Sequence, residues 1–176
     1  MRNKAVFLDR DGTIIEDKGY LKNPEDINLI KEAGTALANL KKAGFLLIVI
    51  TNQSGIGRGF FTLNTVQKQH ENLQHLLEPY KIQLDDFEIC PHAPYENCSC
   101  RKPQPDMIST AAEKFNISLP ESFMVGDKDS DIKAGREAGC TTVLIGSRTV
   151  EKAEPHTRVK NISEAADYIL EKVSEK

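Results

Sequence analysis

Two acidic residues, Asp9 and Asp11, stand one residue apart directly after the first apolar run of the chain. Residues two apart on an extended segment project to the same side, so the spacing predicts that both carboxylates converge on one site. Two carboxylates that close repel each other, and a hard divalent cation such as Mg²⁺ relieves that cost. The alternative is a plain Asp-Gly turn at residues 11–12, with Asp9 capping a neighbouring element.

A second acidic turn, residues 126–131, follows a later apolar run and opens a helical pattern. Asp127 is expected to complete a metal shell with the first acidic turn, and Asp131 to orient or support that shell. The alternative is a group of acids that the dipole at a helix N-terminus favours, and for Asp129 we prefer that interpretation.

A polar turn, residues 51–55, follows the second apolar run. Its hydroxyls, amides and glycine-exposed backbone N–H groups suit a phosphate. The alternative is a turn whose side chains only satisfy the local backbone. The polar side chains concerned are those of Thr51, Asn52, Gln53 and Ser54.

A basic pair, Arg101 and Lys102, lies between the polar turn and the second acidic turn. A lysine there can act as a point charge on a transferring phosphoryl group, and an arginine can bind a second phosphate through two hydrogen bonds. The alternative is a solvated basic pair, which we would favour if the acidic turns were absent.

Three cysteines and one histidine follow the pattern Cys-x-His, then Cys-x-Cys, within eleven residues: Cys90, His92, Cys98 and Cys100. Three thiolates and one imidazole make a closed tetrahedral Zn²⁺ set, which predicts a structural role. The alternatives are a disulfide between two of the cysteines, for which a Cys-x-Cys pair is awkward, or buried free thiols. Because the basic pair follows at once, a loop bound to zinc would direct both cations toward the active site.

The remaining Cys and His residues carry no such pattern. Cys140 is expected to be a small buried hydrophobic residue. His70 and His75 lie on one helical pattern, where core or surface roles are expected, and His156 in a polar loop is uninformative.

Buried strands are expected to position these groups at their carboxyl ends. Between the strands, apolar residues recur at spacings of three and four, which is typical of helices. This alternation predicts an α/β fold with a doubly wound, Rossmann-like parallel sheet and right-handed crossovers. The strands are predicted at residues 5–8, 45–50, 87–89, 122–125 and 141–145, and the helices at residues 36–43, 63–80, 107–115, 132–138 and 165–173.

Local signals mark several helix ends. Thr62 is a plausible N-cap, and Pro105 suits a first turn. Gly44 and Gly139 are expected to close the helices that precede them.

Two segments, residues 13–30 and 91–104, are too long for ordinary connections, and long loops in compact domains are usually functional. Residues 147–160 are polar, and we expect mobility there. We expect a single domain over residues 1–176, with residues 90–104 as a zinc-binding insertion. No stretch is long enough for a separate cap domain, so the site should be open.

The composition excludes several classes of protein. The 176 residues carry 23 Lys and Arg against 26 Asp and Glu, which gives a net charge of −3. No apolar run approaches the length of a membrane span or of a secretory signal. The acidic balance and the low aromatic content disfavour nucleic-acid binding. We expect a cytoplasmic monomer whose clustered thiols hold metal rather than form disulfides.

Four of these segments resemble the motifs of the haloacid dehalogenase superfamily of phosphohydrolases, in their usual order: DxDGT, a strand-end Thr, a Lys, and GDxxxD. The resemblance spans roughly residues 5–145. It implies that Asp9 is a nucleophile that becomes phosphorylated, while Asp11 protonates the leaving group and then deprotonates water. It further implies that Asp9, the backbone carbonyl of Asp11, and Asp127 hold Mg²⁺, and that Thr51 and Lys102 hold the phosphoryl oxygens.

The zinc loop ending in Cys-x-Cys-Arg-Lys-Pro resembles a narrow branch of that superfamily, in which sugar bisphosphate phosphatases stand beside histidinol-phosphate phosphatases. Three stretches resemble those of the sugar bisphosphate enzymes: residues 17–20, 51–59 and 126–128. Only five residues separate His92 from Cys98, which is closer to the histidinol branch. The resemblance implies that substrate is bound by Asp17, Lys18, Gly19, Tyr20, Asn52, Gln53, Ser54, Arg101 and Lys128.

The favoured hypothesis is a Mg²⁺-dependent phosphatase acting on a small sugar bisphosphate. The alternatives are a histidinol-phosphate phosphatase, a DNA 3′-phosphatase, and a zinc-stabilised binding module without turnover. The acidic balance weakens the DNA enzyme. All five motif residues are present, which weakens the silent module: Asp9, Asp11, Thr51, Lys102 and Asp127.

Overall fold

Six parallel strands form a single sheet in the computed structural model, which describes residues 2–147 and 154–174. The strand order is β3-β2-β1-β4-β5-β6. The strands that follow β1 are first added on one side of it, as β2 and β3, and then on its other side, from β4 to β6. Such a switch point opens a crevice at the carboxyl ends of β1 and its neighbours. The strands are β1 (Ala5–Leu8), β2 (Leu46–Asn52), β3 (Asp86–Cys90), β4 (Phe123–Gly126), β5 (Thr141–Ile145) and β6 (Thr157–Val159).

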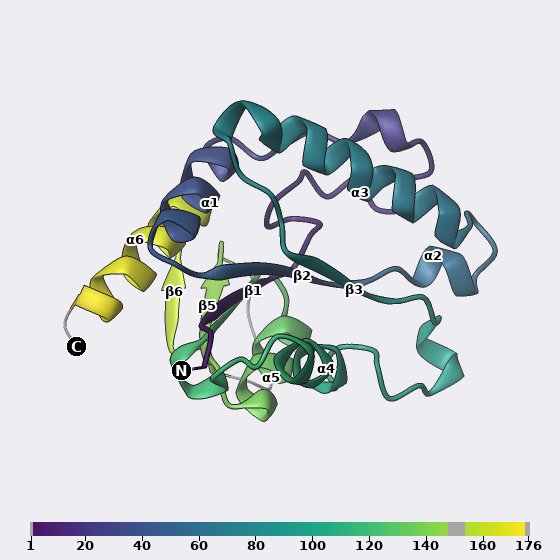
Figure 1. Cartoon of the computed structure of the whole chain (residues 1–176). Coiled ribbons are helices and arrows are strands. Elements are labelled where there is room, and N and C mark those ends of the chain that lie inside the picture. The colour runs from purple at the N-terminus through teal and green to yellow at the C-terminus, as the bar shows by residue number, and fades with distance from the viewer. Residues whose placement is uncertain (1, 148–153, 175–176) are drawn as a thin grey trace.

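Helices cover both faces of the sheet (Figure 1). On one face lie α1 (Ala33–Lys42), α3 (Leu63–Leu77) and α6 (Ile162–Ser174), and on the other lie α4 (Asp106–Lys114) and α5 (Asp129–Ala138). Successive residues of a strand therefore belong to different cores: Val6 packs with the first group and Phe7 with the second. Both are fully buried, which explains why the central strands read as unbroken apolar runs.

The five predicted strands and the five predicted helices are confirmed, with shifts of a few residues at their ends. Two short elements were not predicted, β6 and the single turn α2 (Ser54–Gly57). Strand β6 has only three residues, is only partly buried, and lies at the edge of the sheet, so it carries no apolar signal. Three short 3-10 turns were also not predicted: Pro24–Asp26, Pro94–Glu96 and Leu119–Glu121. A fourth, Glu78–Tyr80, forms the end of the helix predicted over residues 63–80.

The predicted helix ends agree with the structure in three of four cases. The Thr62 hydroxyl accepts the Thr65 N–H and caps α3. Gly139 ends α5 with a φ of 87°, and Gly44 has the same φ just after α1. Pro105 precedes the first turn of α4 as its N-cap rather than standing inside it.

The first long segment, residues 13–30, folds back on itself beside the site. Ile15 bridges to both Asp11 and Leu29, and Ile30 N–H donates to the Ile14 carbonyl at 2.9 Å. The Asn72 amide of α3 donates to the Pro24 carbonyl at 3.0 Å. Helix α3 therefore holds this segment in place.

The second long segment, residues 91–104, docks on α2. Gly57 N–H donates to the Pro91 carbonyl at 2.9 Å, and a Cβ added at Gly57 would lie 2.6 Å from the Ala93 nitrogen. Only glycine permits this approach. The segment expected to be mobile, residues 147–160, contains β6, and its residues 148–153 lie outside the described residues. Among the described helices, none has both the length and the apolar character needed to cross a bilayer.

Candidate active site

Three buried carboxylates meet at the carboxyl ends of β1 and β4. Oxygens of Asp9, Asp127 and Asp131 all lie within 4.8 Å of one another. Asp9 follows β1 directly, and its N–H donates to the Val125 carbonyl of β4 at 2.9 Å, which fixes the two turns together. Gly12 has a φ of 86°, and a Cβ there would lie 2.6 Å from Asp127 Oδ2. Glycine at that position therefore lets Asp127 reach the first acidic turn.

Lys102 reaches this acid cluster from the loop before α4 and is buried with it. Its Nζ lies 2.8 Å from Asp9 Oδ1 and 2.7 Å from Asp131 Oδ1. Burial alone would lower the pKa of Lys102, but the charges of Asp131 and Asp9 outweigh burial and raise that pKa above its usual value. Lys102 is therefore a fixed cation at the floor of the site.

Asp131 is the least accessible of the three acids. Burial and the neighbouring Asp9 charge raise the pKa of Asp131 to about 6, although Lys102 opposes the shift. Its Oδ2 accepts the Lys128 N–H at 3.0 Å, which also caps the start of α5. Asp131 thus holds Lys102 and the start of the acidic turn, and it also belongs to the group of carboxylates that a cation would face.

Asp11 does not belong to that carboxylate group, although the spacing predicted convergence with Asp9. Its two oxygens instead accept hydrogen bonds from Arg10, at 3.0 Å from Nε and 3.1 Å from Nη2. Gln53 Nε2 donates to Asp11 at 3.0 Å and to Thr51 Oγ1 at 2.8 Å. Asp9 turns toward Asp127 and Asp131, while Asp11 turns away from them toward Arg10 and Gln53.

A cleft of about 330 Å³ opens above these groups. Asp11 and Gln53 line it, so the side chain turned away from the acids faces the space where a substrate would lie. Eight of the nine residues predicted to bind substrate line the same cleft: Asp17, Gly19, Tyr20, Asn52, Gln53, Ser54, Arg101 and Lys128. Gly55 of the polar turn also lines it, as does Ser130, which was not predicted.

Lys18 is the exception among the predicted substrate residues. Its Nζ donates to the Asp26 carbonyl at 2.7 Å and lies 3.8 Å from Glu16, so the structure holds it within segment 13–30 and outside the cleft lining. Asn52 has a second role, because its side chain exchanges two hydrogen bonds of 3.0 Å with the backbone of Lys102. It thereby fixes the lysine as well as lining the cleft.

Two cations stand at the cleft wall. Lys128 Nζ lies 3.3 Å from Asp17 and 3.9 Å from Asp127. Partial burial would lower the pKa of Lys128, but Asp9, Asp127 and Asp17 raise it. Arg101 Nη1 donates to the His92 carbonyl at 3.3 Å, which ties it to the cysteine loop. A ligand in this cleft therefore meets cations beyond Lys102.

A larger cleft, about 480 Å³, lies at the opposite end of the sheet, where Lys4 and Phe123 contribute to its lining. None of the acid cluster lines it. The chemistry of the side chains, not the size of the cavity, therefore locates the site.

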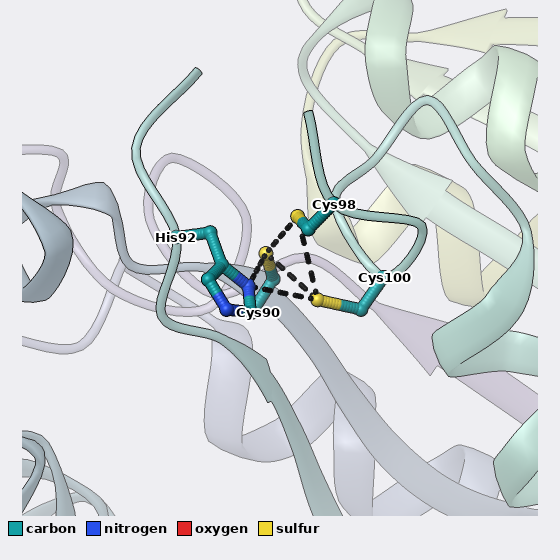
Figure 2. Close-up of side chains that lie close together, drawn as sticks. All are labelled: Cys90, His92, Cys98 and Cys100. Atoms are coloured by element: carbon teal, nitrogen blue, oxygen red, sulfur yellow. Dashed lines mark hydrogen bonds between the residues drawn. The ribbon is translucent and has the colours of Figure 1, made fainter. Parts of the chain in front are cut away.

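The predicted Cys-His set gathers around one point (Figure 2). The three sulfur atoms lie 3.1, 3.5 and 3.6 Å apart, and His92 Nδ1 lies 3.3 Å from the Cys100 sulfur. A disulfide needs about 2.05 Å, and all described cysteines are free, so that alternative is wrong. Tetrahedral zinc with bonds of about 2.3 Å spaces its sulfurs about 3.8 Å apart. The observed spacings are shorter than that but far longer than a disulfide.

The remaining Cys and His residues lie away from both clusters. Cys140 is buried in the core, as predicted, and burial raises its thiol pKa to about 12. His70 is buried on α3 and stacks on Phe87, with ring centroids 4.1 Å apart. His75 is exposed beside Glu78.

Both clusters fit the metals expected from their donors. The acid cluster offers hard carboxylate oxygens and carries more negative charge than Lys102 offsets, which suits Mg²⁺. Three sulfurs and one imidazole nitrogen suit Zn²⁺ and leave no open coordination position.

A switch-point aspartate, a strand-end threonine, a buried lysine and a second acidic turn, arranged on this sheet, define a hydrolase of the haloacid dehalogenase type. A family model described as HAD-hydrolase-like matches residues 99–176. In sequence, the chain is 44% identical to the D-glycero-β-D-manno-heptose-1,7-bisphosphate 7-phosphatase of Helicobacter pylori strain J99, over 95% of this chain and 97% of that protein. It is 40% identical to the protein of that name from Pseudomonas putida, over 88% and 91% of the two chains.

In structure, the chain resembles the D,D-heptose 1,7-bisphosphate phosphatase of B. bronchiseptica, solved with magnesium and phosphate. The TM-score is 0.89 at 28% identity, over 96% of this chain and 99% of that one. The chain belongs to the family of D-glycero-β-D-manno-heptose-1,7-bisphosphate 7-phosphatases, which are phosphoric monoester hydrolases.

Proposed function

We propose that this chain hydrolyses the 7-phosphate of D-glycero-β-D-manno-heptose 1,7-bisphosphate with Mg²⁺, through a phosphorylated aspartate. The observation that carries the proposal is the buried group of Asp9, Asp127 and Lys102 beneath a cleft with further cations on its wall. The names of the curated relatives support the sugar. The product would serve the synthesis of heptose precursors for lipopolysaccharide or other surface glycans.

In the first step, an Asp9 oxygen attacks phosphorus and the bond from phosphorus to the sugar oxygen breaks. Asp11 donates its proton to that oxygen, so the sugar leaves as an alcohol. In the second step, Asp11 takes a proton from water as the water attacks the phosphorus of phospho-Asp9. Inorganic phosphate leaves, and both carboxyl groups return to their initial states.

Cations lower the cost of bringing the Asp9 carboxylate to an anionic phosphate. Two like charges about 4 Å apart cost about 4 kcal/mol at an effective dielectric constant of 20, which is worth about three decades in rate. Asp9, Asp127 and the backbone carbonyl of Asp11 would hold Mg²⁺, which supplies charge neutralisation at the transferring group. Lys102 and the Thr51 hydroxyl would hold phosphoryl oxygens from the other side.

Zinc would have a structural role in this proposal. Bound by Cys90, His92, Cys98 and Cys100, it would hold residues 90–104 as an insertion in a single domain, so that Arg101 and Lys102 keep their positions. A cytoplasmic location and a monomeric state complete the proposal, the first because free thiols persist in a reducing compartment.

A panel of phosphate esters tests this function. We expect phosphate release that requires Mg²⁺, with kcat/KM at least about tenfold higher for heptose 1,7-bisphosphate than for heptose 7-phosphate. A charge-assisted hydrogen bond to the second phosphate contributes about 1.5–3 kcal/mol, which corresponds to that factor or more. Faster hydrolysis of histidinol phosphate, or equal kcat/KM for the bisphosphate and the monophosphate, would contradict the proposed substrate.

Lys128→Gln tests whether a cation on the cleft wall supplies that preference. We expect the ratio of kcat/KM for bisphosphate over monophosphate to fall about tenfold, because one charged contact to the distal phosphate is lost. Lys133→Gln is the matched control, since Lys133 is exposed on α5, the helix that Lys128 precedes, and lies outside the cleft lining. An unchanged ratio in Lys128→Gln would exclude this role.

A further inference from the structure

The Arg10 side chain, which the proposed reaction does not use, is among the largest fully buried side chains of the described chain, at 1% exposure. Its guanidinium faces Asp11 with one edge, through Nε and Nη2. Its Nη1 donates to Gln69 Oε1 at 2.7 Å and lies 3.4 Å from His70 Nε2. Every nitrogen of the group therefore faces a polar partner, and both Asp11 oxygens are engaged.

A buried guanidinium is expensive unless it is paired and hydrogen-bonded. Helix α3 supplies the partners from consecutive positions, Gln69 and His70, both of which are buried. Burial first, and then the Arg10 charge, lower the pKa of His70 to about 3, so the imidazole is neutral near pH 7 and adds no second cation. The buried charge is thus balanced by Asp11.

The same network reaches the two segments that border the cleft. Gln69 Nε2 donates to the Leu21 carbonyl at 2.7 Å, within residues 13–30. On the other side, Gln53 holds Asp11 Oδ2 and the Thr51 hydroxyl. A guanidinium clamped at Gln69 leaves the carboxylate of Asp11 little freedom to rotate. That carboxylate is held at the cleft wall and apart from the metal-binding acids.

We propose that Arg10, fixed by Gln69 and His70 of α3, is a positioning residue that holds the Asp11 carboxyl group where it exchanges a proton with the leaving sugar oxygen. The inference rests on the proposed function, because it assumes that Asp11 is the acid of the first step. In that step the Asp11 proton moves to the sugar oxygen as the phosphorus–oxygen bond breaks and the bond from Asp9 to phosphorus forms.

The choice of leaving group distinguishes positioning of an acid from general support of the fold. A sugar alkoxide needs a proton to leave, whereas 4-nitrophenolate leaves without one. The parameter to compare is kcat/KM, which reports steps up to departure of the leaving group and excludes hydrolysis of phospho-Asp9. A merely structural role would lower kcat/KM equally for both esters.

Two variants of the intact protein carry the test. Arg10→Lys keeps the positive charge but loses the planar fork, and Gln69→Met removes the clamp without touching Asp11. We expect kcat/KM for heptose bisphosphate to fall about 100-fold in Arg10→Lys, at the lower end of the roughly 100- to 10,000-fold that general acids contribute, and about tenfold in Gln69→Met, which misplaces the acid only in part. For 4-nitrophenyl phosphate, both should stay within about threefold of the unmodified protein. Gln67→Met, at an exposed position of α3, is the control and should change neither value.

Asp11→Asn separates failure of this inference from failure of the proposed function. Like Arg10→Lys, it should lose kcat/KM for heptose bisphosphate and keep kcat/KM for 4-nitrophenyl phosphate. Its loss for the sugar ester should be larger than that of Arg10→Lys. If the unmodified protein does not hydrolyse the sugar ester, the proposed function fails. If Asp11→Asn hydrolyses it normally, the proposed function stands, but Asp11 is not the acid and the positioning role fails with it. If Asp11→Asn loses that activity while Gln69→Met and Arg10→Lys retain theirs, or lose both substrates equally, only the positioning role is overturned. Should Arg10→Lys fail to fold, Gln69→Met decides.

Discussion

Asp9→Asn is expected to lower kcat/KM for heptose bisphosphate by at least about four decades, with the fold retained. Loss of a nucleophile removes the covalent route altogether, so its effect is among the largest that a single substitution produces. The amide has nearly the shape of the carboxylate, and the Asp9 oxygen that accepts from Lys102 at 2.8 Å has an amide counterpart. The measurement is steady-state phosphate release, together with mass spectrometry of acid-quenched protein for phosphate on residue 9.

Asp129→Asn is the matched control for Asp9→Asn. Asp129 belongs to the second acidic turn, but its carboxylate is not among the clustered acids. We expect activity within a few-fold of the unmodified protein and the same zinc content in both variants. Full activity in Asp9→Asn, or phosphate trapped on another residue, would refute the proposed mechanism.

Cys98→Ser is expected to abolish zinc binding and to lower kcat/KM about 100-fold. Cys98 lies 3.5 Å from Cys90 and 3.6 Å from Cys100, so its loss opens the tetrahedral set. Zinc binding of this kind contributes about 10–16 kcal/mol to the order of its loop. Without it, Lys102 loses a fixed approach to Asp9, and a displacement of about 1 Å in a positioning group costs about 100-fold in rate.

The zinc prediction is checked by metal content, by hydrogen exchange over residues 91–104, and by phosphate release. Exchange should rise in that segment while the central strands stay protected, because their side chains are buried on both faces of the sheet. Cys140→Ala is the control, since Cys140 lies in the core outside the zinc set. Native protein without zinc, or a Cys98→Ser protein with full zinc and full activity, would contradict the structural role.

The central strands were predictable because burial of both faces of a strand requires an unbroken run of apolar residues. Residues 46–50 are apolar at every position, since alternate side chains enter opposite cores. Strand β6 has no such run, because its three residues lie at the edge of the sheet, are not fully buried and can therefore be polar. Strands were thus predictable from the sequence where both of their faces are buried.

Asp9, Thr51 and Asp127 could be named from the sequence because each stands at the end of an apolar run, whereas Lys102 was named from the basic pair after the cysteines. Their proximity depends on the strand order, which places β4 beside β1 and so brings Asp127 to Asp9 across more than a hundred residues. The Cys-His spacing was sufficient to predict its own cluster, since all four ligands come from one short segment. Local motifs therefore predict well which residues form a site. They predict that those residues lie close together only when all of them come from one short segment.

Side-chain direction was not predictable. The two-residue spacing favoured convergence of Asp9 and Asp11, but Asp11 turns to Arg10, whose burial depends on Gln69 and His70 of a distant helix. Lys18 turns to the Asp26 carbonyl for a similar reason, because segment 13–30 folds onto itself. The amino-acid order alone thus specified which chemical groups are present and the strands that carry them. Contacts of α3 with Arg10 and with segment 13–30 specified where Asp11 points, because hydrogen-bond partners far apart in the chain meet only after folding.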